Sequence, residues 1–389
     1  PSNYGYIEID SEGFQKFRKE NMKVVSYMVK EFEMRKNALQ MKKASSAKTG
    51  DLNLDKIFSY KFNNDIFKKI TVVPDGKSHG LVIFLDWSGS MFNHIQNTVN
   101  QLLNLVMFCK KVNIPYEVFT FTDCYSKRNG MFSQRENDIA LSSEFRLVNI
   151  FSSRMNASEF SYAAGAMFAL GSGKAFVPNI FRMNGTPLNE TIVCAMDIIP
   201  QFQKKYRLQV VNTIFLTDGD GNPLNNYYNE LENLRYINSI DYSHGGYRSN
   251  IFVLTDPKTK HQVRLDLGSP YQRTASFIEL LKHRTNSNVI GFYILNSVQF
   301  RNRIHTFFKS DECIDATEKF KKENYSVVTT AGFDEYYMLR SESLDVDEDV
   351  EFVVKENATT RGLVSAFSKY TKNRLNNRVV LNRFIGMIA

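Results

Sequence analysis

LVIFLDWSGS, residues 81–90, begins with five consecutive apolar residues and ends in a short polar stretch. A continuous apolar run of this length is typical of a strand that is covered on both of its faces. The carboxylate, the glycine and the two serines that follow are typical of a tight loop. The stretch therefore predicts a buried parallel strand with polar side chains at its carboxyl end.

Strand and helix patterns alternate outward from this stretch. Further strands are predicted at residues 116–121, 146–151, 210–216, 289–295 and 326–330. Helical patterns separate them, at residues 95–112, 158–170, 188–206, 276–283 and 316–322. Such alternation predicts an α/β fold with a doubly wound, mainly parallel sheet.

The flanking segments suggest a division into three regions. Apolar residues recur at helical spacing over residues 11–43 among many Lys and Arg, which predicts a long basic amphipathic helix. A polar stretch follows at 44–51, and then a short helical segment near 54–58. We assign residues 1–75 to an N-terminal helical region, 76–340 to the α/β domain, and 341–389 to an acidic linker with a C-terminal helix. Residues of about 220–270 form an insertion, because 251–255 and 262–267 have the pattern of a hairpin.

Composition limits the classes of protein without selecting one. The formal net charge of +8 is compatible with nucleic acid, an acidic partner or a phosphorylated substrate. The four cysteines form no CxxC pair, which argues against a sulfur-rich zinc site and against a disulfide framework. No apolar stretch approaches the length that crosses a bilayer. We therefore expect a cytoplasmic protein with reduced thiols and no membrane contact.

Polar residues follow three elements of the predicted sheet. Asp86, Ser88 and Ser90 follow the strand at 81–85, Asp218 follows the strand at 210–216, and Thr186 precedes the helix at 188–206. In doubly wound sheets ligands bind at the carboxyl ends of the strands, and hard oxygen donors suit Mg²⁺, Mn²⁺ or Ca²⁺. Each element alone has a simpler interpretation, as a helix cap or an Asp-Gly turn. Together the three predict a metal site.

The three motifs, DWSGS, NGTPL and LTDG, resemble the loops of the metal-ion-dependent adhesion site of von Willebrand factor A (VWA) domains. The resemblance covers about residues 80–330. It implies that Ser88, Ser90 and Thr186 ligate the metal through their hydroxyls, while Asp86 and Asp218 act largely through bound water. It also implies a sixth coordination position for an acidic side chain of a partner.

A narrower resemblance concerns the stretch SSAKTGDL at 45–52, the leucine-containing segment after it, and the GTPL loop. These are similar to the VWA (T) subunit of aerobic cobaltochelatase and to VWA proteins that work with a MoxR-type AAA+ ATPase. The resemblance implies such an ATPase as the partner, with ATP hydrolysis on the partner and no intrinsic activity here. Trp87 and the insertion after Asp218 depart from that pattern and put chelatase activity in doubt.

Three functions therefore remain open. The first is a non-catalytic cytoplasmic interaction subunit, and the second is a chelatase subunit that acts in insertion of metal into a tetrapyrrole. The third is an RNA-binding protein similar to Ro-type VWA proteins, which the basic helix and the net charge favour. The stretch GSGKA at 171–175 lacks the earlier glycine of a phosphate-binding loop, so no ATP site is expected.

Overall fold

The central sheet contains seven strands. The computed structural model describes residues 10–43, 45–52, 61, 67–72, 78–123, 139–140, 144–173, 176–222, 225–228, 233–236, 240–241, 248–249, 252–266, 269–328 and 332–341. Within them the strand order is β15-β16-β14-β7-β3-β4-β6. The strands are β3 (His79–Asp86), β4 (Tyr116–Asp123), β6 (Phe145–Ser152), β7 (Val210–Thr217), β14 (Asn288–Leu295), β15 (Tyr325–Val328) and β16 (Glu335–Arg340).

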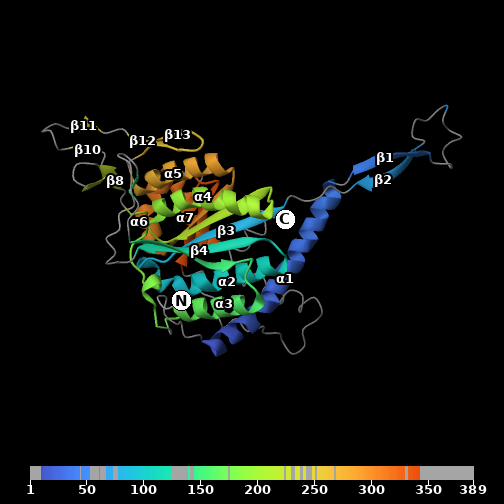
Figure 1. Ribbon diagram of the computed structural model, residues 1–389, viewed down its shortest axis with the longest axis horizontal. Coiled ribbons are helices and arrows are strands. Elements are labelled where there is room, and N and C mark those ends of the chain that lie inside the picture. Colours follow the sequence, from blue (N-terminus) through green and yellow to red (C-terminus); the bar gives the residue numbers. More distant parts are fainter. Residues whose placement is uncertain are drawn as a thin grey trace.

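This sheet is mainly parallel. Four of its six described strand pairs are parallel, and the two antiparallel pairs, β4 with β6 and β15 with β16, lie at the two edges. Helices cover both faces, as Figure 1 shows. The predicted fold class, an α/β fold with a doubly wound sheet, is confirmed.

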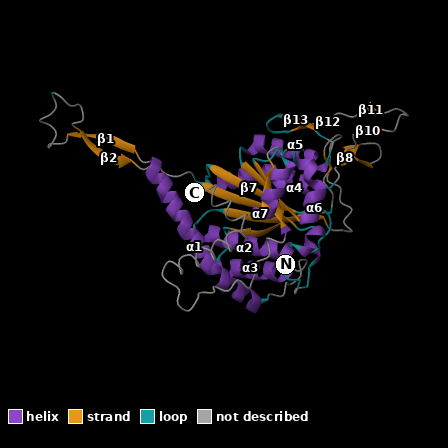
Figure 2. Cartoon of the chain, turned by 180° about the vertical axis from the view of Figure 1, so that it is seen from behind, coloured by secondary structure: helices purple, strands orange, loops and turns teal. Residues whose placement is uncertain are grey.

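Two helical layers enclose the sheet (Figure 2). One layer contains α2 (Ile95–Lys111) and α3 (Ala157–Gly171), with α1 (Ser11–Lys43) packed against them. The other contains α4 (Leu188–Tyr206), α5 (Pro270–Thr285), α6 (Ser297–Phe307) and α7 (Cys313–Glu323).

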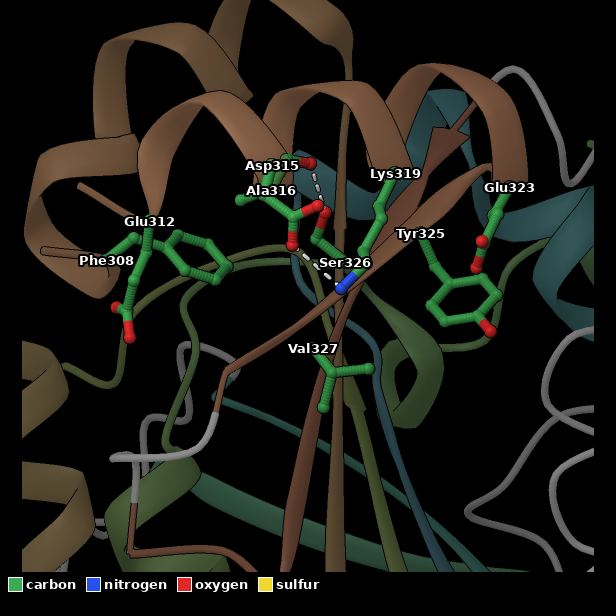
Figure 3. A pocket seen from close by; sticks show the side chains of 9 residues that line it. All are labelled: Phe308, Glu312, Asp315, Ala316, Lys319, Glu323, Tyr325, Ser326 and Val327. Atoms are coloured by element: carbon green, nitrogen blue, oxygen red, sulfur yellow. Dashed lines mark hydrogen bonds and ion pairs between the residues drawn. The ribbon is translucent and has the colours of Figure 1, made fainter. Parts of the chain in front are cut away.

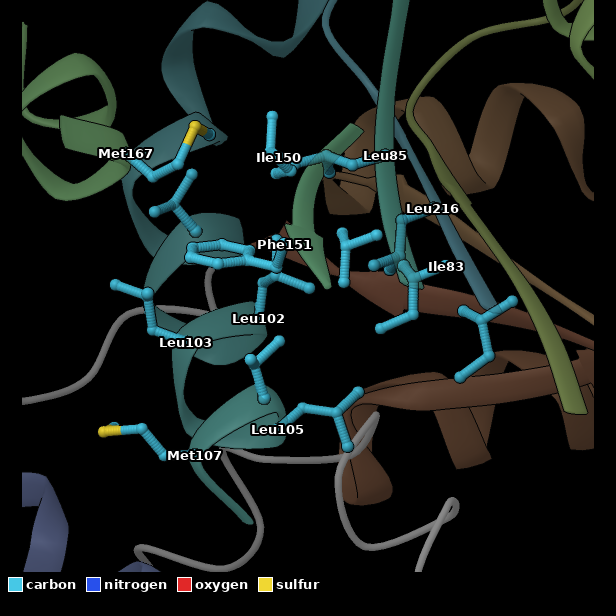
Figure 4. Packing of buried hydrophobic residues seen from close by; sticks show 14 of the residues in the cluster. Ile83, Leu85, Leu102, Leu103, Leu105, Met107, Ile150, Phe151, Met167 and Leu216 are labelled. Carbon is cyan, nitrogen blue, oxygen red and sulfur yellow. The ribbon is translucent and has the colours of Figure 1, made fainter. Parts of the chain in front are cut away.

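The central strand β3 supplies side chains to both layers because alternate residues point to opposite faces. Ile83 and Leu85 pack with Leu102 of α2 and Met167 of α3, as Figure 4 shows. Val82 and Phe84 belong to the opposite core, where Phe84 stacks on the Phe215 ring with 5.0 Å between centroids. Burying a side chain of this size contributes about 1.5–3 kcal/mol relative to exposure.

Helix α1 confirms the predicted amphipathic pattern, with Phe14, Phe17, Val25, Met28 and Phe32 buried against α2 and α3. Its far end extends beyond the body of the molecule, and the paired strands β1 (Ser45–Leu52) and β2 (Phe67–Val72) lie there (Figures 1 and 2).

The assignment of residues 1–75 to a helical region is therefore wrong for β1 and β2. The Ile-Thr-Val run that ends β2 favours a strand. The polar residues of β1 form a strand because β1 pairs antiparallel with β2. The helical segment predicted near 54–58 lies outside the described residues.

The insertion contributes no strand to the central sheet within the described part of the chain. The predicted hairpin is confirmed as β12 (Phe252–Thr255) and β13 (Gln262–Leu265), which pair antiparallel. Leu254, Val263 and Leu265 anchor this hairpin in the core formed with α4 and α5. Shorter strands of the insertion are β8 (Asn225–Tyr228), β9 (Asn233–Tyr236), β10 (Ile240–Asp241) and β11 (Arg248–Ser249), and β8 pairs with β5 (Ile139–Ala140).

Among the strands of the central sheet and the helices that cover it, β16 and α6 were absent from the sequence prediction. The strand predicted at 326–330 is β15, an antiparallel edge strand, and the parallel strand beside β14 is β16. Helix α6 was also missed, although Asn296 and Gln299 form the capping box that begins it. The acidic linker and C-terminal helix predicted for 341–389 lie outside the described residues, Ser341 excepted.

Candidate metal centre

The strand order creates a ligand-binding position between β3 and β7. The chain leaves β3 toward β4 on one side and later returns to β7 on the other. Ligands in open α/β sheets bind at this kind of switch point, beyond the carboxyl ends of the strands. Asp86 is the last residue of β3, and Asp218 directly follows β7. The topology therefore brings the two predicted aspartates to one edge of the sheet.

Asp86 is a buried residue of the strand rather than a residue of an exposed loop. Its Oδ2 accepts a hydrogen bond from Thr217 Oγ1 at 2.6 Å, and its Oδ1 accepts one from the Ser88 amide at 2.9 Å. Burial raises the pKa of Asp86 to about 7, against the opposing effect of these hydrogen bonds, and the charge of Asp218 raises it further. A cation nearby would relieve the cost of this buried charge.

Ser88, Ser90 and Asp218 form a continuous chain of oxygen atoms. Ser90 Oγ donates to Asp218 Oδ1 at 2.7 Å, and Ser88 Oγ lies 3.0 Å from Ser90 Oγ. The Ser90 proton is given to Asp218, so Ser90 Oγ can accept a hydrogen bond from a neighbouring hydroxyl. Burial raises the pKa of Asp218, while the Ser90 hydrogen bond lowers it.

The simpler interpretation of the serines as helix caps does not hold. The short 3₁₀ helix η2 (Ser90–Asn93) and α2 both begin without a side-chain capping bond. The hydroxyls of Ser88 and Ser90 instead bond to each other and to Asp218.

Thr186 faces the same space from a third loop. A Cβ atom added at Gly219 would lie 3.4 Å from Thr186 Oγ1 and 3.8 Å from Ser90 Oγ, so both hydroxyls lie close to this glycine. The simpler interpretation of Thr186 as the cap of α4 does not hold: Pro187 holds the cap position, no side chain caps it, and Leu188 is the first helical residue. All five predicted metal residues are thus brought to one edge of the sheet.

Backbone and amide contacts lock the Thr186 loop against the other two. The Gly89 amide donates to the Asn184 carbonyl at 2.7 Å, which links the loops directly. Asp123, at the end of β4, accepts from the Gly185 amide and from Asn222 Nδ2. Asn222 Oδ1 in turn accepts from the Thr186 amide at 3.1 Å.

Sequence reasoning missed Asp123 and Asn222. The available signal for Asp123 was its position, because it ends β4 as Asp86 ends β3. No local pattern around Asn222 indicates its role, since its partners are separated from it by 36 and 99 residues.

The donor set fits a hard divalent cation. Three hydroxyls and two carboxylates supply only oxygen, the donor that Mg²⁺, Mn²⁺ and Ca²⁺ prefer. Within the described part of the chain, no Lys or Arg forms an ion pair with Asp86 or Asp218. The described residues also contain no group of three or more His, Cys, Asp and Glu suited to a metal. Any cation here would therefore depend on neutral hydroxyls.

Trp87 fastens the first loop to the segment before Thr186. Its Nε1 donates to the Phe181 carbonyl at 2.7 Å, and its ring meets the Phe181 ring edge-on. Its amide donates to the Phe121 carbonyl of β4 at 2.9 Å. Trp87 thus serves as a buried tie between the Ser88 loop and its neighbours.

Two further hollows of the surface are separate from this edge. Figure 3 shows one of about 300 Å³ along α7 and the outermost strand β15, where Lys319 is paired with Asp315 at 2.8 Å. A wider one, of about 640 Å³, lies beside α3 and the opposite edge strand β6. Neither is lined by any of the five predicted metal residues.

Comparison with known proteins leaves the family open. No family model and no curated protein matches the sequence. The solved structures with similar chains include the pilus adhesin SpaC of Lactobacillus rhamnosus GG, with 12% identity over 78% of this chain and a TM-score of 0.35. This chain spans 31% of the SpaC chain.

Two further structures are similar at the same level. The vWF domain of the type V pili tip protein Mfa5 of Porphyromonas gingivalis has 8% identity, covers 77% of this chain and 95% of its own, and has a TM-score of 0.33. Human COPII-coat protein Sec24c has 12% identity, covers 69% and 30%, and has a TM-score of 0.26. The fold class accordingly rests on the strand order and not on these neighbours.

Among the described residues no helix combines the length and the apolar character required to cross a membrane.

Proposed function

We propose that this chain is a metal-dependent protein-interaction module of the VWA type. Ser88, Ser90 and Thr186 bind Mg²⁺, or Mn²⁺ or Ca²⁺, directly, while Asp86 and Asp218 hold its water shell. The cation then accepts a carboxylate from a protein partner. The observation that carries the proposal is the chain of oxygens from Ser88 through Ser90 to Asp218, in which the hydroxyls cap no helix.

The chemistry of this donor set suits binding rather than catalysis. When bound, the metal supplies a Lewis-acidic position for an anionic ligand. Neutral hydroxyls leave most of the cation's charge uncompensated, so an incoming carboxylate gains a strong charge-assisted contact. The residues of the chain fix the position of the ligand, because backbone bonds between Gly89 and Asn184 and between Gly185 and Asp123 hold the loops together.

The finer part of the proposal concerns the partner. A MoxR-type AAA+ ATPase is proposed on the similarity of the GTPL loop and of residues 45–52 to proteins that work with such an ATPase. ATP hydrolysis would belong to the partner. The proposal places the complex in the cytoplasm, where the thiols of Cys109, Cys194 and Cys313, which are free, stay reduced. The chelatase and RNA-binding interpretations remain predictions of the sequence.

The experiment is co-purification of the chain with a candidate MoxR-type ATPase, with Mg²⁺ and with EDTA. We expect a complex in Mg²⁺ that is lost in EDTA and in the Ser88→Ala/Ser90→Ala variant. The matched control is Ser158→Ala/Ser161→Ala, which removes two exposed hydroxyls from α3. A complex that survives both EDTA and the first variant undiminished contradicts docking through the metal. The basic face of α1 would then become the better candidate for the contact.

A further inference from the structure

A fixed guanidinium group lies beside the candidate metal centre. Arg303 of α6 donates from Nη1 to Asp220 Oδ2 at 2.8 Å and to Tyr293 Oη at 2.5 Å. Asp220 lies in the metal loop, two residues after Asp218, and Tyr293 lies on β14, so the guanidinium is held from two elements. A side chain held in this way loses little further conformational freedom when it binds a ligand.

The strand register places this group at the same edge of the sheet as the metal residues. Tyr293 is the register partner of Thr217, whose hydroxyl holds Asp86. Neighbouring strands are about 4.8 Å apart. Burial raises the pKa of the Tyr293 phenol most, and among the smaller effects the charges of Asp218 and Asp86 raise it too. Arg303 therefore contacts the loop that carries Asp218, through Asp220, and the strand beside β7, through Tyr293.

One edge of the guanidinium is open. Both hydrogen bonds of Arg303 use Nη1, and no partner for Nε or Nη2 occurs among the described residues. The Arg303 side chain is 42% exposed, whereas its anchor Asp220 is 28% exposed. The planar fork formed by Nε and Nη2 matches the two oxygens of a carboxylate.

We propose that Arg303 binds a second carboxylate of the partner, so that the centre selects a segment with two acidic groups. One carboxylate completes the coordination of the cation, and the other meets the open edge of Arg303. This inference rests on the proposed function of the metal centre. In an extended segment, side chains two positions apart point to the same side and lie about 6.6–6.8 Å apart. The ligand class we infer is a segment with two acidic residues, and an acidic residue, a spacer and a second acidic residue present both on one side.

The test uses two fluorescein-labelled peptides, GGDGDGG and GGDGNGG, with blocked ends and differing in one carboxylate. Their affinities for the full chain are measured by anisotropy in saturating Mg²⁺ and in EDTA. Uptake of Mg²⁺ is measured separately by calorimetry. We expect the wild-type chain to bind the two-acid peptide about tenfold more tightly, a typical effect of one charged hydrogen-bonded contact. Arg303→Gln should bring both peptides to the affinity of the one-acid peptide.

Two further variants separate charge from geometry. Arg301→Gln removes the same charge from an exposed position of α6 and should keep the tenfold preference. Arg303→Lys keeps the charge without the planar fork and should keep only part of the preference for the two-acid peptide. If Arg303→Gln fails to fold, as judged by thermal melting, Tyr293→Phe removes one anchor of the guanidinium and should reduce the preference.

The outcomes distinguish the two proposals. Metal-dependent binding with no preference for two acids, or a preference that survives Arg303→Gln, overturns this inference and leaves the proposed function standing. Failure of the wild-type chain to take up Mg²⁺, with peptide binding indifferent to EDTA, overturns the proposed function and this inference with it.

Discussion

Ser90 donates a hydrogen bond to Asp218 across the loops that end β3 and β7, with 2.7 Å between Oγ and Oδ1. The two residues are separated by 128 positions in the chain, and only the adjacency of the two strands brings them together. A hydroxyl beside a carboxylate at this switch point, free of any capping role, is what a hard cation requires.

Asp86→Asn should weaken Mg²⁺ binding while it preserves the fold. Asparagine keeps the shape that meets Thr217 and the Ser88 amide but lacks the charge that orders the metal's water shell. Loss of a carboxylate that supports a metal through other groups typically costs about 10–100-fold in affinity. Calorimetric titration with Mg²⁺ measures the change, with Asp311→Asn, an exposed substitution, as control. Unchanged affinity would mean that Asp86 has a purely structural role.

The metal-free protein should become less stable as pH rises from 5 to 8. Burial raises the pKa values of Asp86 and Glu190 to about 7, above their ordinary values of 3.8 and 4.5. The folded state thus keeps protons that the unfolded state releases. The free energy of unfolding therefore falls as pH rises through this window, and the whole decrease is present above pH 7.

Thermal melts across this pH range test that dependence. Glu190→Gln should make the melting temperature depend less on pH, because Glu190 Oε2 is buried without a hydrogen-bond partner. Saturating Mg²⁺ should raise the melting temperature most at pH 8, where Asp86 is charged. A melting temperature that rises steadily from pH 5 to 8 without metal would contradict the burial of these charges.

Phe92→Ala should weaken partner binding without changing metal binding. Phe92 is 70% exposed and lies two residues after Ser90, in the η2 helix that begins at Ser90. Aromatic residues at the centre of an interface often contribute about 2 kcal/mol or more. The affinity of Phe92→Ala for the ATPase partner is compared with the affinity of the control variant Met34→Ala, which shortens an exposed side chain of α1. Equal affinities of the two variants would exclude Phe92 from the interface.

Trp87 should report metal binding directly. It is the only tryptophan of the chain and lies between two residues of the centre, Asp86 and Ser88. Because its ring is fixed by Phe181, reordering of the loop around a cation should change its emission. Fluorescence is recorded during a Mg²⁺ titration, with excess EDTA as the reversal. An emission spectrum that is constant while calorimetry detects uptake would place the cation away from this loop.

The sequence predicted the elements whose signal is local. The apolar runs of β3, β7 and β14 identify strands buried on both faces, and the polar residues after β3 and β7 identify the edge where the metal residues meet. Thr186 was located by its place before the predicted helix at 188–206 and by the resemblance of its loop to that of VWA domains. These features could be read without the structure because each depends on neighbouring residues.

Features that depend on distant partners were not predicted. Asp123 supports the Thr186 loop through Gly185, 62 residues away, and Arg303 meets Asp220, 83 residues away. Strand β1 is polar in composition and is a strand because it pairs with β2. The burial of Asp86 was not predicted for a similar reason, since its environment is built by Thr217 from the neighbouring strand.

The central claim is that hydroxyls at this edge bind a divalent cation, and calorimetric titration of Mg²⁺ into the wild-type chain and into Ser88→Ala/Ser90→Ala tests it most directly. We predict saturable binding of one Mg²⁺ to the wild-type chain, and no measurable binding to the variant at the same concentrations although its far-ultraviolet spectrum is unchanged. Ser158→Ala/Ser161→Ala should bind as the wild type does. Equal Mg²⁺ affinity of the wild-type chain and Ser88→Ala/Ser90→Ala, or no binding to the wild-type chain, would contradict the account.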